Sequence, residues 1–229
     1  MAKRISHSWL DPWLGPPLKS LYHVLPIPRR FPPEGIVAVG HLLAILGAVG
    51  MAFSTNHWWG GLLVALGVTG NHTADCLDGT HARSTGQCRN GGELLDHFTD
   101  PLSFAYWLLG LAVSCGRPYW GVVAVICLYA TAVLTNIKAK LIGEFTLARF
   151  GPTEFKVLLS VYGLLMAAVC MAGGSSVIAQ NWATRFFAVL IVIGILQLVV
   201  NLWLAVRDVN QLGAAPDESE WVTSDDCQG

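Results

Sequence analysis

Four aspartates gather in one polar stretch of an otherwise apolar chain, and their spacing fits helical faces. Asp75 and Asp78 are three residues apart, and Asp96 and Asp100 are four residues apart. Two helices joined by a short connection run antiparallel, so we expect the four carboxylates to surround one cavity. Like charges and burial both oppose ionisation of grouped carboxylates, and bound divalent cations would offset that cost.

The chemistry of this group favours a particular class of metal. It offers hard oxygen ligands without thiolates or paired imidazoles, which points to Mg²⁺ or Mn²⁺. Several neighbouring aspartates suit two ions, an arrangement that stabilises both the entering and the leaving oxygen in phosphoryl displacement. The sequence therefore predicts two ions held by Asp75, Asp78, Asp96 and Asp100.

Small residues accompany the acids. Gly79 and Ala82 lie on the same helical face as the first two aspartates and leave room for a flat group such as a nucleotide. Arg83 follows them, and its planar guanidinium suits phosphate oxygens. Gly92 would give similar clearance on the facing helix. Capping or solvation at helix ends would explain each acid alone, but not this combination.

The composition indicates the environment of these helices. The chain has 229 residues, of which 53% are hydrophobic and 13% charged, whereas soluble domains carry about 25% charged residues. The formal net charge is −1. These values argue against a soluble globule, a disordered chain or a nucleic-acid binder. The six cysteines have no metal-site or disulfide spacing.

Six stretches are long and apolar enough to be predicted as transmembrane helices. They are Gly35 to Phe53, Trp58 to Asp75, Gly92 to Val113, Pro118 to Ile137, Glu154 to Ala172 and Ala183 to Val206. All but Arg117 and Arg185 of the 14 Lys and Arg residues fall on one side of this arrangement. By the positive-inside rule, both termini and the aspartates face the cytoplasm.

The sequence thus predicts an all-α integral membrane protein with three parts. Residues 1–33 form a cytoplasmic segment whose apolar and basic residues favour an amphipathic helix lying in the membrane interface. A flexible tail is the alternative there, favoured by Pro16 and Pro17. Residues 34–210 form the six-helix domain, and residues 211–229 form a polar cytoplasmic tail.

The aspartate pattern resembles the signature of a known enzyme family. Asp75-x-x-Asp-Gly-x-x-Ala-Arg, eight residues, then Gly92-x-x-x-Asp-x-x-x-Asp is similar to the signature of the CDP-alcohol phosphotransferases. The resemblance implies a six-helix bundle, often a homodimer, that displaces CMP from a CDP-linked alcohol by attack of a hydroxyl. It also implies that the four aspartates hold two metals and that Gly79, Ala82, Arg83 and Gly92 bind the CDP group.

Two further segments resemble a subgroup, the choline and ethanolamine phosphotransferases. Gly92-Glu-Leu-Leu-Asp-His97 is similar to their G-E-L-F-D-H, and Gly151-Pro-Thr-Glu154 to their G-P-T-E. The resemblance implies that His97 and Glu154 activate the acceptor hydroxyl, and Asp100 is the alternative base. The chain departs from the family at Pro33-Glu-Gly-Ile-Val37, where P-N-x-x-T is frequent, and it has no further helices after the sixth.

The predicted function is transfer of a phospho-alcohol from CDP-choline or CDP-ethanolamine to a lipid hydroxyl such as that of diacylglycerol, with release of CMP. One alternative is a phosphatidyltransferase that joins CDP-diacylglycerol to a small alcohol or phospho-alcohol. Another, from a different class, is a membrane ion carrier or transporter, since intramembrane acids often mark ion paths. Transporter sites usually lie near the midplane, however, whereas these acids gather at one membrane face.

Overall fold

The computed structural model describes residues 3–147 and 150–213, and six long helices dominate them. Each of the six apolar stretches predicted from the sequence coincides with one of these helices, most of which extend further at one or both ends. The helices are α2 (Pro33–Phe53), α3 (Trp58–Thr85), α4 (Asn90–Ser114), α5 (Pro118–Ile142), α6 (Pro152–Met171) and α7 (Ser176–Leu212). The all-α prediction is therefore confirmed.

Four of the six helices are long and apolar enough to cross a membrane, namely α2, α5, α6 and α7. Helices α3 and α4 are long enough, but polar and acidic residues lower their hydropathy. The structure thus supports four candidate spans, and the crossing of the bilayer by all six helices stays a prediction.

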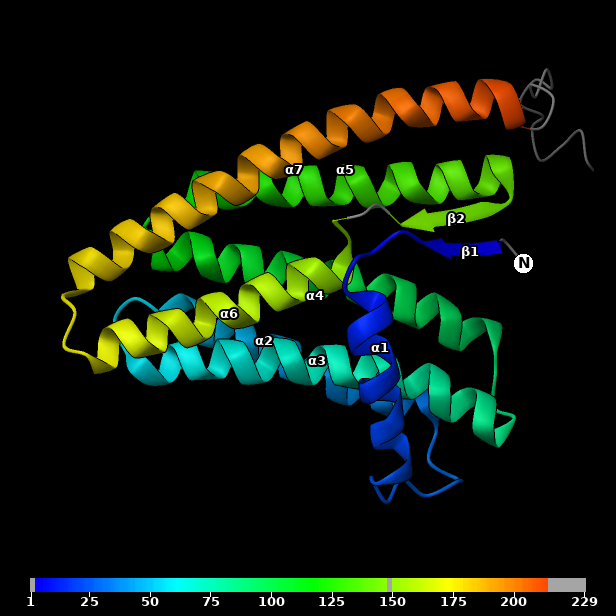
Figure 1. Cartoon of the computed structure of the whole chain (residues 1–229), viewed down its shortest axis with the longest axis horizontal. Helices are drawn as coiled ribbons and strands as arrows, with labels where there is room; N and C mark the ends of the chain where they lie inside the picture. The colour runs from blue at the N-terminus through cyan, green and yellow to red at the C-terminus, as the bar shows by residue number, and fades with distance from the viewer. Residues whose placement is uncertain (1–2, 148–149, 214–229) are drawn as a thin grey trace, which may run out of the picture.

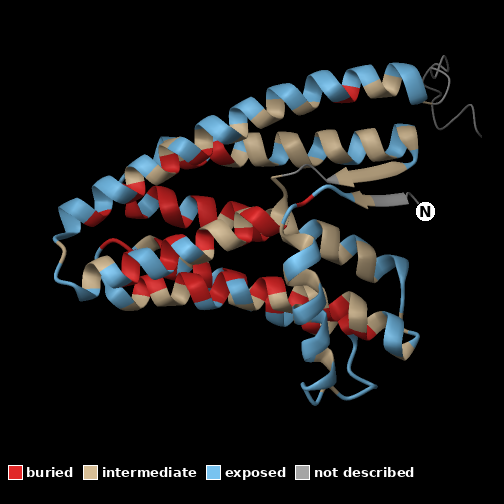
Figure 2. Cartoon of the chain, in the orientation of Figure 1, coloured by how far each residue is buried: buried red, intermediate tan, exposed pale blue. Residues whose placement is uncertain are grey.

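The bundle has an inner and an outer part. Helix α2 packs against both α3 and α4, and α6 packs against α3, whereas α5 packs against α4 and α7 (Figure 1). Buried residues concentrate on the inner helices, while α5 and α7 have few of them (Figure 2). Trp107 of α4 lies fully buried in this core, and its indole Nε1 donates a hydrogen bond to the carbonyl of Ala44 on α2, at 2.9 Å.

Glycine pairs let the inner helices approach closely. A Cβ on Gly61 of α3 would lie 2.3 Å from the carbonyl oxygen of Gly163 on α6, and a Cβ on Gly67 would lie 2.5 Å from the backbone of Gly47 on α2. Small residues at crossings allow such close backbone contact, which is a common device of membrane helices. These crossings fix α3 against the helices on its two sides.

The N-terminal segment is ordered and packs on α3. It contains α1 (Asp11–Ser20) and a 3₁₀ turn (Leu21–His23), and α1 runs across the direction of the bundle helices (Figure 1). Pro16 and Pro17 lie inside α1, so they do not prevent a helix here. The helix has no buried residue, but its location in the membrane interface stays a prediction.

A small parallel sheet was not predicted from the sequence. Strand β1 (Lys3–Ser6) pairs with β2 (Glu144–Leu147), which follows α5. The segments are far apart in the chain, so no local pattern could reveal the pairing. The predicted tail, residues 211–229, lies mostly outside the described residues: α7 continues to Leu212, and the description ends at residue 213.

Candidate active site

The signature residues lie on the ends of α3 and α4 that face each other. Helix α3 continues without a break beyond Asp75 and ends at Thr85. The next residue, Gly86, has a φ of 72°, the left-handed conformation that glycine adopts without strain. Helix α4 begins at Asn90 after a short loop. Because α2 packs against both helices, it holds their acidic ends opposite each other.

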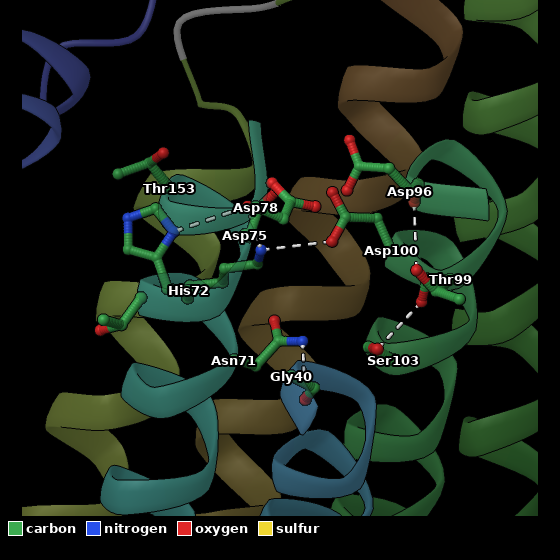
Figure 3. A network of polar contacts seen from close by, with 12 residues as sticks. Gly40, Asn71, His72, Asp75, Asp78, Asp96, Thr99, Asp100, Ser103 and Thr153 are labelled. Atoms are coloured by element: carbon green, nitrogen blue, oxygen red, sulfur yellow. Dashed lines mark hydrogen bonds and ion pairs between the residues drawn. The ribbon is translucent and has the colours of Figure 1, made fainter. Parts of the chain in front are cut away.

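Three carboxylates meet at this place. Asp75, Asp78 and Asp96 each offer one oxygen, and these oxygens lie within 4.8 Å of one another. Figure 3 shows the side chains from α3 and α4 pointing toward the same space, with Asp100 beside them. Carboxylate oxygens at such separations can share one cation, so the donor set fits a hard divalent metal. The predicted convergence of the two helix faces is therefore present in the structure.

Asp100 has a different partner. The ammonium of Lys156, near the start of α6, lies 3.3 Å from Asp100 Oδ1 and 2.8 Å from Asp75 Oδ2. The Lys156 side chain is 1% exposed, so this contact is enclosed by protein. Asp100 lies outside the group of three carboxylates that could share an ion. Its predicted role as a metal ligand stays a prediction.

The strip of small residues lies beside the acids. The guanidinium of Arg83 lies over Gly79, since a Cβ on that glycine would be 3.1 Å from Arg83 Nη1. Arg83 is exposed, whereas Gly79, Ala82 and Gly92 are partly exposed. A Cβ on Gly92 would meet only Glu34, at 3.7 Å. Arg83 is therefore accessible to an anion, next to carboxylates that could hold a cation.

Comparison with known proteins identifies this arrangement. A family model described as CDP-alcohol phosphatidyltransferase matches residues 33–209. The chain belongs to this family. The match covers more than half of the chain and includes every signature residue from Asp75 to Asp100. The family resemblance predicted from the sequence is confirmed.

Relatives in this family carry two different names. The chain is 34% identical to cholinephosphotransferase 1 of Gallus gallus over 122 residues, which are 49% of this chain and 36% of that protein. It is 31% identical to phosphatidylinositol phosphate synthase of Mycolicibacterium smegmatis over 112 residues, which are 47% of this chain and 49% of that protein. The chain thus covers less than half of the length of these relatives.

His97 and Glu154, the predicted catalytic pair, have different neighbours in the structure. His97 is partly exposed, and its Nε2 lies 3.8 Å from Glu93 Oε1, one helical turn earlier. Its ring also contacts that of Phe145 on β2, with centroids 5.3 Å apart. Glu154 is buried at the start of α6. The catalytic roles of His97 and Glu154 stay predictions.

The contacts of Glu154 attach the N-terminal segment to α6. Its Oε1 accepts hydrogen bonds from Ser8 Oγ at 2.6 Å and from the backbone N–H groups of Trp9 and Leu10 at 2.8 and 3.1 Å. Its Oε2 accepts from the N–H of Gly151 at 2.9 Å. Because all these donors bind the Glu154 carboxylate, it has a structural function. Its position at the start of a helix did not reveal this function in the sequence.

Asp11 strengthens the same attachment. Its carboxylate accepts hydrogen bonds from the hydroxyls of Ser6 and Thr153. Burial opposes its ionisation, but the hydrogen bonds from Ser6, Thr153 and Ser8 outweigh this effect and lower the pKa of Asp11 below its ordinary value. The N-terminal segment is therefore held to the end of α6 that also carries Lys156.

Two residues that border the acids were not among the predicted site residues: Lys156 had no predicted site role, and for His72 a contact with substrate was weighed against packing or a hydrogen bond. Lys156 counted only as one of the cytoplasmic positive charges, although an ionisable residue inside an apolar stretch usually faces the bundle interior. His72 is buried, with its Nδ1 3.9 Å from Asp75 Oδ2, and both ring nitrogens lack a hydrogen-bond partner among the described residues. The apolar surroundings of Lys156 were the signal that could have revealed it.

Proposed function

We propose that this chain is a membrane-embedded, metal-dependent transferase that moves a phospho-alcohol group from a CDP-alcohol to a hydroxyl acceptor and releases CMP. The observation that carries the proposal is the meeting of Asp75, Asp78 and Asp96 within 4.8 Å. Arg83 lies beside them, over Gly79, and offers its guanidinium to the phosphates of a nucleotide. Membership in the family favours a transferase over the ion carrier also considered.

The donor set fits Mg²⁺ or Mn²⁺, which we propose as the cofactor. When bound by the three aspartates, the cation would polarise phosphoryl oxygens and neutralise part of the diphosphate charge. Arg83 binds phosphate oxygens with its planar fork, while Gly79, Ala82 and Gly92 give clearance for the cytidine group.

The acceptor hydroxyl attacks the phosphorus that carries the alcohol. A new bond forms between the acceptor oxygen and this phosphorus, and the bond to the bridging oxygen breaks, so that CMP leaves with the electron pair. We propose His97 as the base that takes the hydroxyl proton, with Asp100 as the alternative. The contacts of Glu154 favour an anchoring role over the predicted catalytic one.

Two substrate classes have specific support. The segments Gly92 to His97 and Gly151 to Glu154, together with the similarity to cholinephosphotransferase 1, favour CDP-choline or CDP-ethanolamine with a lipid acceptor such as diacylglycerol. The similarity to phosphatidylinositol phosphate synthase supports the alternative, CDP-diacylglycerol with a small alcohol or phospho-alcohol. We propose the first class.

We also propose how the enzyme lies in the membrane. The six apolar stretches favour six membrane crossings, and the distribution of Lys and Arg favours a cytoplasmic location for both termini and the acids. The large exposed apolar surface of α5 and α7 suits contact with membrane lipids or with a second copy in a homodimer. We retain residues 1–33, 34–210 and 211–229 as the proposed interfacial segment, catalytic domain and tail.

The direct test is release of CMP by the purified protein. Incubation with CDP-choline, CDP-ethanolamine and CDP-diacylglycerol, each with matching acceptors and Mg²⁺ or Mn²⁺, is expected to yield CMP with one of the first two donors and diacylglycerol. Consumption of CDP-diacylglycerol alone would select the alternative. Absence of CMP with every donor would contradict the enzyme proposal.

A further inference from the structure

Lys156 lies where a second cation would otherwise be needed. Four aspartates face one space, but only three of them form a group that could share an ion. The fourth, Asp100, and one oxygen of Asp75 are held by the Lys156 ammonium at 3.3 and 2.8 Å. A carboxylate has two oxygens, so Asp75 can hold Lys156 with one and contribute the other to an ion shared with Asp78 and Asp96.

The surroundings of Lys156 keep its ammonium between these carboxylates. The side chain is 1% exposed, and on its apolar side the Nζ lies 5.5 Å from the centre of the Phe104 ring. Moving the ammonium away from both carboxylates would leave a buried charge without partners, which is strongly unfavourable. The tight crossing of α6 and α3 at Gly61 and Gly163 also fixes the backbone that carries it.

We propose that Lys156 is a built-in substitute for a second metal ion, so that the site takes one divalent cation at Asp75, Asp78 and Asp96. This inference rests on the proposed function for the presence of the first ion. A second dication between Asp75 and Asp100 would lie next to a buried ammonium, and the two would repel each other. The prediction of two ions from the sequence rested on the number of aspartates and did not include this lysine.

The test counts bound Mn²⁺ in the purified, full-length protein. Equilibrium binding combined with electron paramagnetic resonance is expected to find one Mn²⁺ per chain, with the spectrum of an isolated ion. In K156M, which keeps the length of the side chain and removes its charge, we expect two Mn²⁺ per chain with a spin-coupled spectrum. The matched control is K138M, whose lysine pairs with Asp208 between α5 and α7, and it should still bind one.

Substitution of the aspartates gives a second test, in which Lys156 stays unchanged. Asp96→Asn is expected to lose Mn²⁺ binding, whereas Asp100→Asn is expected to keep one Mn²⁺ per chain, because Asp100 pairs with Lys156 instead of the ion. Equal loss in both variants would overturn the inference. So would two coupled Mn²⁺ in the wild type, or a single Mn²⁺ in folded K156M.

The result can be separated from that of the proposed function. A wild-type protein that releases CMP and binds two coupled Mn²⁺ would keep the function and remove the role of Lys156. A protein that binds one Mn²⁺ but releases no CMP from any donor would keep the role of Lys156 and contradict the proposed function. If K156M does not fold, the wild-type count and the two aspartate variants still decide the outcome.

Discussion

At the scale of single residues, the site is organised by compensation of negative charge. Grouped carboxylates repel each other, and each one needs a cation or a set of hydrogen-bond donors. Asp75, Asp78 and Asp96 are close enough to share a metal ion, whereas Asp100 has Lys156. Glu154 instead accepts hydrogen bonds from the N-terminal segment. Acids near one another in space therefore have different partners and different expected roles.

Asp75→Asn and Asp96→Asn are each expected to reduce CMP release to the background rate. An amide keeps the size of the side chain but loses the charge that holds a divalent cation, so metal affinity should fall while the fold persists. Mn²⁺ titration and circular dichroism on the same samples would separate these effects. Wild-type turnover in either variant would contradict the metal assignment.

His97→Ala is expected to lower kcat by about 100-fold or more, the usual contribution of a general base. The KM for the CDP-alcohol should change little, because the imidazole acts on the acceptor hydroxyl. Steady-state kinetics with varied donor concentration would measure both constants. An equal loss in donor affinity would make His97 a binding residue instead.

Glu154→Ala is expected to release the N-terminal segment from α6. Hydrogen bonds to a charged group contribute about 1.5–3 kcal/mol each, so loss of this carboxylate should expose the backbone near Ser8 to limited proteolysis. Ser8→Ala removes one of the donors and should have a smaller effect. An unchanged digestion pattern together with abolished kcat would restore the catalytic interpretation of Glu154.

At the scale of helices, glycine crossings determine how closely the site residues approach each other. Lys156 on α6 can contact acids of α3 and α4 because α6 lies directly on α3, with glycine at the crossing of both helices. Helix α2 performs the corresponding function for α3 and α4 by packing against both. The geometry of the site therefore depends on residues that take no part in its chemistry.

Gly61→Ala is expected to destabilise the protein by about 1–3 kcal/mol, the usual cost of overpacking. The new methyl group would lie 2.3 Å from the Gly163 carbonyl oxygen, so the two helices would have to separate. Gly194→Ala is a matched control, since a Cβ at this helical position of α7 meets nothing within 4 Å. Thermal unfolding in detergent should show a lower Tm for the first variant alone.

At the scale of the whole molecule, the bundle presents two kinds of surface. The outer helices α5 and α7 expose many apolar side chains, while α1 and the loop between α3 and α4 lie at the part of the bundle that carries the acids (Figure 1). A bilayer would cover the first surface and leave the second in contact with water. With these two surfaces, a water-soluble nucleotide and a membrane lipid could both reach the site from the same face of the membrane.

The orientation can be tested by labelling of cysteines. Cys88 is exposed in the loop between α3 and α4, so in a Cys227→Ser background a membrane-impermeant maleimide should label it only after cells are permeabilised. Arg117→Cys, placed in the turn before α5, should add labelling in intact cells. Labelling of Cys88 in intact cells would reverse the proposed cytoplasmic location of the site.

The sequence determined the features of this protein that depend on neighbours along the chain. Helical spacing brings Asp75 and Asp78, or Asp96 and Asp100, onto one face, and long apolar stretches form helices. Lys156 is 81 residues from Asp75, and Glu154 is 146 residues from Ser8. Such pairs depend on which helices pack together, so the tertiary structure alone decided that the lysine joins the acids and that the glutamate holds the N-terminal segment.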